Sequence, residues 1–186
     1  MKTKLQRGSD EVRATGFTVI LGALLIAWAL KRHYSDARAD DLLWILTPTA
    51  RLVGGVCGAT FTLVPGEGYF AREQLFLIGK ACAGVNFMIA AFVMLVWAFV
   101  PHARSLRAVL GVLGLCLAAG YVAAVLVNTV RIAIAMWLAA HPAVLSAFAA
   151  AEVHRVEGIV VYFAGLVALC EMARWLERHA PQGLRS

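Results

Sequence analysis

The stretch KACAGVNF, at Lys80–Phe87, places a cysteine and a glycine at the mouth of an apolar run that continues to Val100. A run of this length, ended by Pro101, predicts a helix that crosses a membrane. Cys82 then stands at the boundary of water and lipid, where a thiol stays partly hydrated and can ionise. The alternative is an inert thiol, because cysteine is often buried as a small hydrophobe.

The composition of the whole chain also indicates a membrane protein. Hydrophobic residues make up 61% of the 186 residues and charged residues 15%, whereas soluble domains have an apolar share of about 45–50%. The net charge is +6, but the basic residues lie beside the apolar runs and form no surface with interleaved aromatic residues. We therefore predict an integral membrane protein that contacts membrane lipids and binds no nucleic acid.

Four apolar runs predict four membrane crossings, at 14–30, 84–100, 108–127 and 158–176. Lysine and arginine precede the first run, separate the second from the third and follow the last, which assigns these positions to the cytoplasm. The expected fold is all-α and integral to the membrane: a small multi-pass helical bundle that forms a single domain over residues 1–186.

The segment between the first two crossings, residues 31–80, is expected on the extracytoplasmic side. Its apolar part, 42–64, contains Arg51, and an arginine in the middle of a membrane span costs about 2.5–3.5 kcal/mol. Asp40–Gly55 is therefore predicted to form an amphipathic helix on the membrane surface. A further crossing by 42–64 is the alternative.

A short β-hairpin is predicted directly before Cys82. Ala59–Val64 and Tyr69–Ile78 are rich in the β-branched and aromatic residues that strands prefer. Between them lies PGEG at 65–68, which is an ordinary turn signal. The hairpin would deliver the chain to the cysteine at the outer membrane face.

The third apolar run continues past Arg131 to Ala140, where a His-Pro pair breaks the helical pattern. A continuous helix over 108–140 would be about 50 Å long, against about 30 Å of hydrocarbon. Its last turns are therefore expected to project on the outer side, the side on which Cys82 lies.

Residues 131–156 are then expected to stay on the outer side, which brings His154 to the same face as Arg131. In the competing interpretation, 132–151 is a crossing of its own and separates these two residues. That interpretation needs a reversal of the chain at 128–131, where the sequence has neither glycine nor proline.

Cys82, Arg131 and His154 could together perform acyl transfer. A thiol with an ordinary pKa of about 8.5 needs a base or a nearby cation at neutral pH, and His154 can be either. Arg131 offers up to five donors for the oxyanion that forms on a peptide carbonyl. In the alternative without a catalytic site, Arg131 is an anchor at the membrane interface and His154 is an ordinary solvated histidine.

Four further residues are candidates for substrate binding or support. Asn128 can cap or kink its helix or donate a second hydrogen bond at the site, and Glu157, one helical turn after His154, can orient the imidazole. Gly84 permits close approach of a helix or of a substrate backbone. Asn86 can bond a neighbouring helix or support the same site.

No metal or cofactor site is predicted. The four cysteines contain no C-x-x-C pair, which argues against a zinc site and a thiol-disulfide relay. The five histidines form no H-E-x-x-H motif, so a metalloprotease is disfavoured.

Three short motifs resemble those of the exosortase and archaeosortase family. They are CAGVNF at 82–87, N-x-x-R-I at 128–132 and H-x-x-x-G at 154–158. The similarity extends from about Leu42 to Leu176 and includes LTPTA at 46–50. Within the family, the short length of the chain and the residues of the first motif are most similar to the subgroup called exosortase K.

The resemblance implies a multi-pass cysteine transpeptidase, or thiol protease, of the bacterial inner membrane that needs no cofactor. Its substrates would be exported proteins with a C-terminal sorting signal of the PEP-CTERM kind: a short motif, a transmembrane helix and a basic tail. Cys82 matches the family's nucleophile, Arg131 its arginine and His154 its histidine. The chain departs from larger members in having fewer crossings and in having Ala83 where they have serine.

Two other functions are compatible with the sequence. One is a non-catalytic scaffold or lipid-binding module in which Arg131 pairs with an anionic headgroup or with a nearby glutamate. The other is a small transporter or channel with Arg131 in its pathway, for which the sequence offers neither paired interrupted helices nor a series of intramembrane acids.

Overall fold

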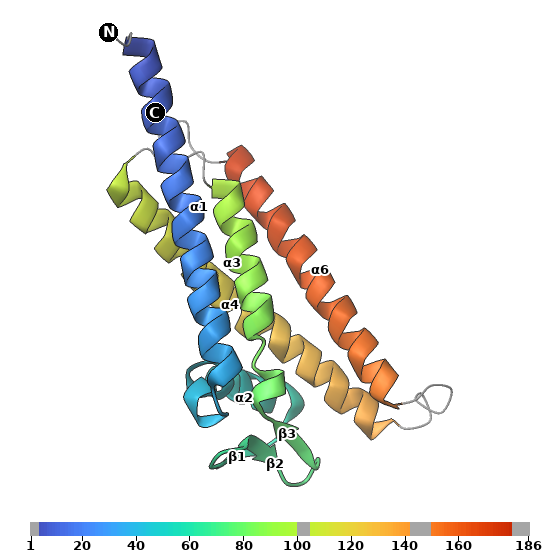
Figure 1. Ribbon diagram of the computed structural model, residues 1–186. Coiled ribbons are helices and arrows are strands. Elements are labelled where there is room, and N and C mark those ends of the chain that lie inside the picture. Colours follow the sequence, from blue (N-terminus) through green and yellow to red (C-terminus); the bar gives the residue numbers. More distant parts are fainter. Residues whose placement is uncertain (1–3, 100–104, 142–149, 180–186) are drawn as a thin grey trace.

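The computed structural model describes residues 4–99, 105–141 and 150–179, with the side chains of residues 4–15, 106, 150–154 and 177 left out. Its helices are α1 (Lys4–Asp36), α2 (Leu43–Cys57), α3 (Val85–Phe99), α4 (Leu106–Ala140) and α6 (Ala150–His179), with short 3-10 helices η1 (Asp40–Leu42) and η2 (Lys80–Cys82). Its strands are β1 (Phe61–Val64), β2 (Gly68–Ala71) and β3 (Phe76–Ile78). Figure 1 shows the helices as one bundle, with α2, the sheet and η2 together at one end, which we call the sheet end.

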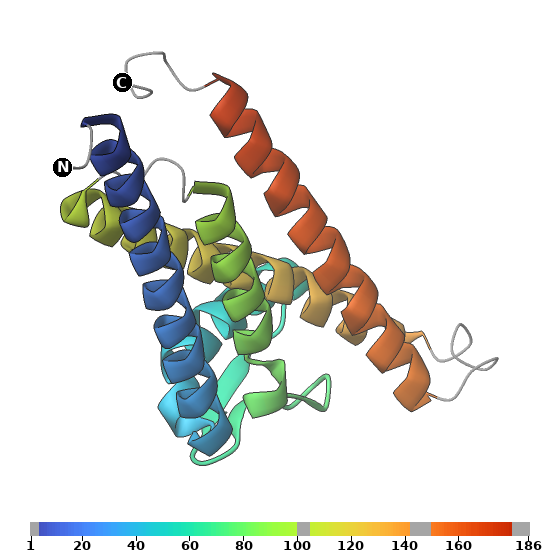
Figure 2. The same cartoon turned by 45° about the horizontal axis from the view of Figure 1, so that its top comes forward.

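Four helical segments are long and apolar enough to cross a membrane: Gly16–Asp36, Lys80–Phe99, Arg107–Ala140 and Arg155–Leu176. Many of their apolar side chains are exposed, as lipid-facing side chains are. α3 packs against α1, α4 and α6, and α4 crosses the other helices obliquely (Figures 1 and 2). The prediction of a small helical bundle, with four helices able to cross a membrane and a short β-structure, is therefore confirmed.

Three helices, α1, α4 and α6, are longer than the crossings predicted for them, whereas α3 matches its predicted run to within one residue at each end. α1 extends beyond the predicted crossing 14–30 in both directions, and α4 runs unbroken from Leu106 to Ala140. The reversal at 128–131 that the competing interpretation required does not occur, because backbone hydrogen bonds of one helix continue through it. Residues 142–149 lie outside the described part of the chain.

The sheet corrects one prediction. β1 and β2 form the expected hairpin, in which Val64 faces Gly68, but Tyr69–Ile78 is not a single strand. The chain turns again at residues 72–75, where Leu75 has φ of 50°, and β3 returns alongside β2 so that Tyr69 faces Ile78. The polar residues at 72–74 interrupt the apolar pattern and favour this turn, so the sheet has three antiparallel strands.

The predicted amphipathic helix at Asp40–Gly55 is present as η1 followed by α2. Its buried face packs against α4, while Arg51 is exposed. Pro48 lies inside α2 and has no N–H, which leaves the carbonyl of Trp44 without its helical donor. The Tyr121 hydroxyl of α4 donates to that carbonyl at 2.8 Å, so a contact with another helix satisfies the oxygen that the proline frees.

α3 and α4 approach each other most closely at Gly120. A Cβ at this position would lie 3.2 Å from the backbone nitrogen of Phe92 and 3.3 Å from the carbonyl oxygen of Met88. Backbone atoms cannot rotate away from a side chain, so a large residue here would force the two helices apart.

We expect Gly120→Leu to lower the free energy of unfolding by about 1–3 kcal/mol. The measurement is thermal unfolding of the purified protein in detergent. Gly114→Leu is the control on the same helix, because no described atom lies within 4 Å of the Cβ that it would add. Equal unfolding temperatures for the two variants would contradict close packing at Gly120.

Candidate functional site

Cys82 is the last residue of η2 and lies at the sheet end, between β3 and α3 (Figure 1). It is half-buried. Its backbone N–H donates to the carbonyl of Gly79 at 2.9 Å, and its own carbonyl accepts from the side-chain amide of Asn128.

η2 is also bound to the end of α1, because the Lys80 ammonium donates to the carbonyls of Ser35 at 3.0 Å and Ala37 at 2.8 Å. The cysteine is therefore held from both sides.

Gly84 joins η2 to α3 in a conformation that only glycine adopts readily. Its φ is +69°, in the left-handed region. A Cβ here would also lie 3.2 Å from Cγ of Asn128. The close approach that the sequence predicted at this glycine is thus made by the side chain of Asn128.

Arg131 reaches Cys82 from α4. The guanidinium is close enough to Cys82 for its charge to act on the thiol, and its Nη1 donates to the Tyr162 hydroxyl at 3.3 Å. Its guanidinium carbon lies 5.3 Å from the centre of the Tyr162 ring. Two residues that are distant in the sequence therefore lie close together, with a permanent positive charge near the thiol.

Gly158 of α6 leaves the space that the arginine occupies. It is buried, and a Cβ at this position would lie 2.9 Å from Nε of Arg131. Real Cβ atoms do not approach other atoms so closely, so any larger residue would displace the guanidinium. The glycine of the H-x-x-x-G motif thus has a direct steric role next to Arg131.

Tyr162 is the residue of this site that the sequence did not predict. Its hydroxyl donates to Oδ1 of Asn128 at 2.9 Å, and its ring packs against Phe87 with a centroid distance of 5.3 Å. The available signal was its position four residues after Gly158, about one helical turn, where it shares a helix face with that glycine. We call Cys82, Asn128, Arg131, Glu157 and Tyr162 the Cys82 cluster.

Asn128 is the centre of the hydrogen bonds in the Cys82 cluster. Only 1% of its surface is exposed, so its amide must be satisfied by protein groups. Tyr162 donates to its oxygen and its nitrogen donates to the Cys82 carbonyl. Asn128 therefore bonds the backbone of Cys82, and its role in a reaction stays a prediction.

The remaining candidates occupy different positions. The carboxylate oxygens of Glu157 are buried, and their charge acts on Arg131 and Cys82. Asn86 is exposed and accepts from the Lys31 ammonium of α1 at 2.9 Å, so no bond joins it to the Cys82 cluster in the described residues. The side chain of His154 lies outside the described part, and its role stays a prediction; its backbone belongs to α6.

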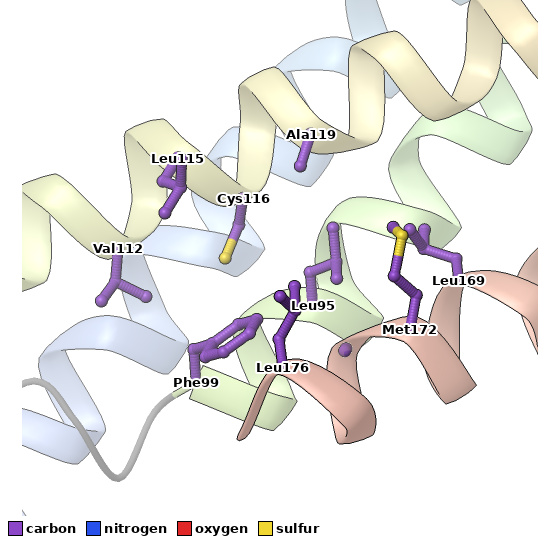
Figure 3. Close-up of a pocket in the computed structure, with 10 residues that line it drawn as sticks. Leu95, Phe99, Val112, Leu115, Cys116, Ala119, Leu169, Met172 and Leu176 are labelled. Carbon is purple, nitrogen blue, oxygen red and sulfur yellow. The ribbon is translucent and has the colours of Figure 1, made fainter. Parts of the chain in front are cut away.

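The other cysteines have different surroundings. Burial alone raises the pKa of the Cys57 thiol, at the end of α2. Cys116 is buried and lines a cavity of about 240 Å³ between α3, α4 and α6, whose described walls are apolar side chains such as Leu95, Phe99 and Leu169 (Figure 3). Among the described residues, Cys82 is the cysteine whose thiol the charge of Arg131 affects.

The cluster combines a nucleophilic atom with a cation and an amide at one end of a membrane bundle. No group of three His, Cys, Asp or Glu side chains suited to a metal ion occurs in residues 4–99, 105–141 and 150–179. Comparisons of the chain with protein-family models, with curated proteins and with solved structures find no match. A function for the chain is therefore inferred from the residues of the Cys82 cluster and their geometry.

Proposed function

We propose that this chain is a membrane-embedded cysteine peptidase or transpeptidase of the exosortase type. The observation that carries the proposal is the chain of hydrogen bonds from Arg131 through Tyr162 and Asn128 to the Cys82 carbonyl, which holds the guanidinium close to the thiol. A cation near a buried thiol offsets part of the cost of forming the thiolate, which is the form that attacks carbonyl carbon. The order of the three sequence motifs supports the same family.

The reaction would proceed in two steps. The Cys82 sulfur attacks a peptide carbonyl, its proton passes to His154, and Arg131 holds the oxyanion of the tetrahedral intermediate. Collapse of the intermediate breaks the C–N bond, and the proton passes from His154 to the leaving amine. The thioester that remains is then attacked by an acceptor nucleophile (water, lipid or glycan), which takes the acyl group and releases the thiol.

The proposed substrate is an exported protein anchored by its C-terminal tail, which has a short motif, one transmembrane helix and a basic tip. Enzyme and substrate would then share the bilayer, so that they meet in two dimensions and the substrate helix aligns the cleaved segment with Cys82. The sheet end would then be extracytoplasmic, in a bacterial inner membrane, as the basic residues before the first crossing, between the second and third and after the last indicate.

Detection of the thioester tests this proposal. The tailed reporter is a soluble protein fused to a C-terminal tail taken from the same genome, with a motif, one apolar helix and a basic tip. We expect a shortened reporter and a covalent adduct on the peptide that contains Cys82. Neutral hydroxylamine should release this adduct, because it cleaves thioesters. Tails of this kind that yield neither product nor adduct would refute the proposal.

A non-catalytic scaffold is the second candidate. The charge of Glu157 on α6 acts on Arg131 of α4, and such a pair could serve only to join the two helices. A scaffold predicts that the four thiols react slowly and alike with impermeant reagents. A peptidase predicts selective reaction at Cys82.

Gly158→Ala is expected to lower reporter cleavage about 10- to 100-fold with little loss of stability. The added Cβ would lie 2.9 Å from Nε of Arg131, and a catalytic group displaced by about 1 Å can cost about 100-fold in rate. Gly111→Ala on α4 is the control, because no described atom lies within 4 Å of its Cβ position. The measurement is the initial cleavage rate, and similar rates for both variants would contradict the steric role of Gly158.

A further inference from the structure

We infer that Tyr162 is a positioning residue that sets the orientation of Arg131 and Asn128 around Cys82. Its hydroxyl bonds Arg131 and Asn128 of α4, and Asn128 in turn bonds the Cys82 carbonyl of η2. Its ring packs against Phe87 of α3. The inference deepens the proposed function and rests on it for its catalytic meaning. The positions of Arg131 and Asn128 beside the thiol can be tested without measuring catalysis.

The hydroxyl of Tyr162 stabilises the orientation of the Asn128 amide that the Cys82 carbonyl requires. It donates to Oδ1 at 2.9 Å, which leaves the Nδ2 group to donate to the Cys82 carbonyl. Rotation of the amide by 180° would oppose Oδ1 to that carbonyl, and two acceptors would then face each other in a buried place. The Cys82 carbonyl therefore selects the amide orientation, and the tyrosine stabilises it by donating to the oxygen that remains.

The same hydroxyl and ring hold the arginine. A tyrosine oxygen can accept a hydrogen bond while its proton is donated elsewhere, and here it accepts from Nη1 of Arg131 at 3.3 Å. The guanidinium carbon lies 5.3 Å from the ring centre, where the negative face of the ring attracts a cation. Both contacts direct the guanidinium towards the space beside the Cys82 sulfur.

The ring is itself fixed by close packing of α6. Phe87 lies 5.3 Å away, centroid to centroid. One turn further along α6, a Cβ at Gly165 would lie 2.8 Å from two side-chain carbons of Val127, so α6 and α4 are in close contact there. A phenylalanine at position 162 would keep this packing and lose only the two bonds of the hydroxyl.

Paired charged reagents test the inference. Tyr162→Phe is made in a protein in which Cys57, Cys116 and Cys170 are alanine, so that Cys82 is the single thiol. The rates of modification by an anionic and a cationic methanethiosulfonate of similar size are then compared. Their ratio reports the charge that the thiol experiences and cancels a general change in access.

We expect the parent to favour the anionic reagent by about tenfold, because Arg131 attracts it. Tyr162→Phe should reduce this ratio about three- to tenfold, as the loss of one hydrogen bond allows the guanidinium to leave the thiol. Tyr121→Phe is the matched control: it removes a hydroxyl that also bonds between elements, to the Trp44 carbonyl, and should leave the ratio unchanged. An unchanged ratio in folded Tyr162→Phe overturns the inference.

Asn128→Ala provides a second variant if Tyr162→Phe does not fold. It removes the amide but keeps the tyrosine hydroxyl beside Arg131, so the preference for the anionic reagent should persist; its loss would overturn the inference. Cleavage of the tailed reporter is measured on the same proteins. A parent that shows the preference but does not cleave the reporter refutes the proposed function and leaves the positioning role of Tyr162 intact.

Discussion

Replacement of Cys82 by alanine is expected to reduce cleavage of the tailed reporter at least about 1,000-fold, to the level of membranes that lack the protein. Without the sulfur no thioester forms, and neither Arg131 nor His154 can supply another nucleophile of comparable strength. Cys82→Ser should be similarly inactive, because a serine hydroxyl is far less acidic than a thiol and is a weaker nucleophile. The measurement is the amount of shortened reporter over time.

The other three cysteines provide the controls for this prediction. Cys57→Ala, Cys116→Ala and Cys170→Ala should retain activity, since these cysteines, on α2, α4 and α6, are not part of the Cys82 cluster. Each variant is compared with the parent by thermal unfolding, so that loss of activity is separated from loss of folded protein. Equal cleavage by Cys82→Ala and the parent would refute the assignment of the nucleophile.

Arg131→Gln is expected to lower kcat about 100- to 1,000-fold, which is the usual effect of removing a group that stabilises an oxyanion. Glutamine keeps hydrogen-bonding capacity but has neither the charge nor the length of the guanidinium that contacts Cys82 and Tyr162. Arg131→Lys should recover only part of the rate, because a lysine ammonium is a point charge without the planar fork. KM should change much less than kcat, since the charge that Arg131 neutralises develops in the transition state.

Arg51→Gln is the matched control for Arg131, because Arg51 is an exposed arginine of α2 at the same sheet end. It should leave both kinetic parameters within about twofold of the parent, as surface substitutions usually do. If Arg131→Gln lowers the unfolding temperature and leaves kcat unchanged, Arg131 is a structural anchor between α4 and α6. In that case the scaffold explanation replaces the proposed catalytic role.

Much of the fold could be predicted because membrane crossings are a local property of sequence. An apolar run of sufficient length must form a helix in hydrocarbon, whatever its neighbours are. The arginine in the middle of the apolar segment similarly predicted a short amphipathic helix at Asp40–Gly55, which the structure contains as η1 and α2. The division of Tyr69–Ile78 into β2 and β3 was missed, because the turn at 72–75 has no glycine or proline and a leucine adopts its positive φ.

The candidate site could be predicted only in part. The motifs identified Cys82, Gly84, Asn128 and Arg131, which the structure brings together. Tyr162 was missed because a tyrosine in an apolar run is typical of a membrane helix and gives no sign of its partners. For Asn86, spacing along the chain did not indicate that its side chain would bond α1.

The sequence by itself determined which segments enter the membrane and which chemical groups the chain carries, because hydropathy and residue type are properties of the chain alone. Only the tertiary structure decided that Arg131 meets Cys82 and that Tyr162 connects Arg131 to Asn128. These contacts depend on how closely the helices approach one another. That approach is set by the absence of side chains at a few glycines, such as Gly120 and Gly158, and by the oblique path of α4 across the bundle.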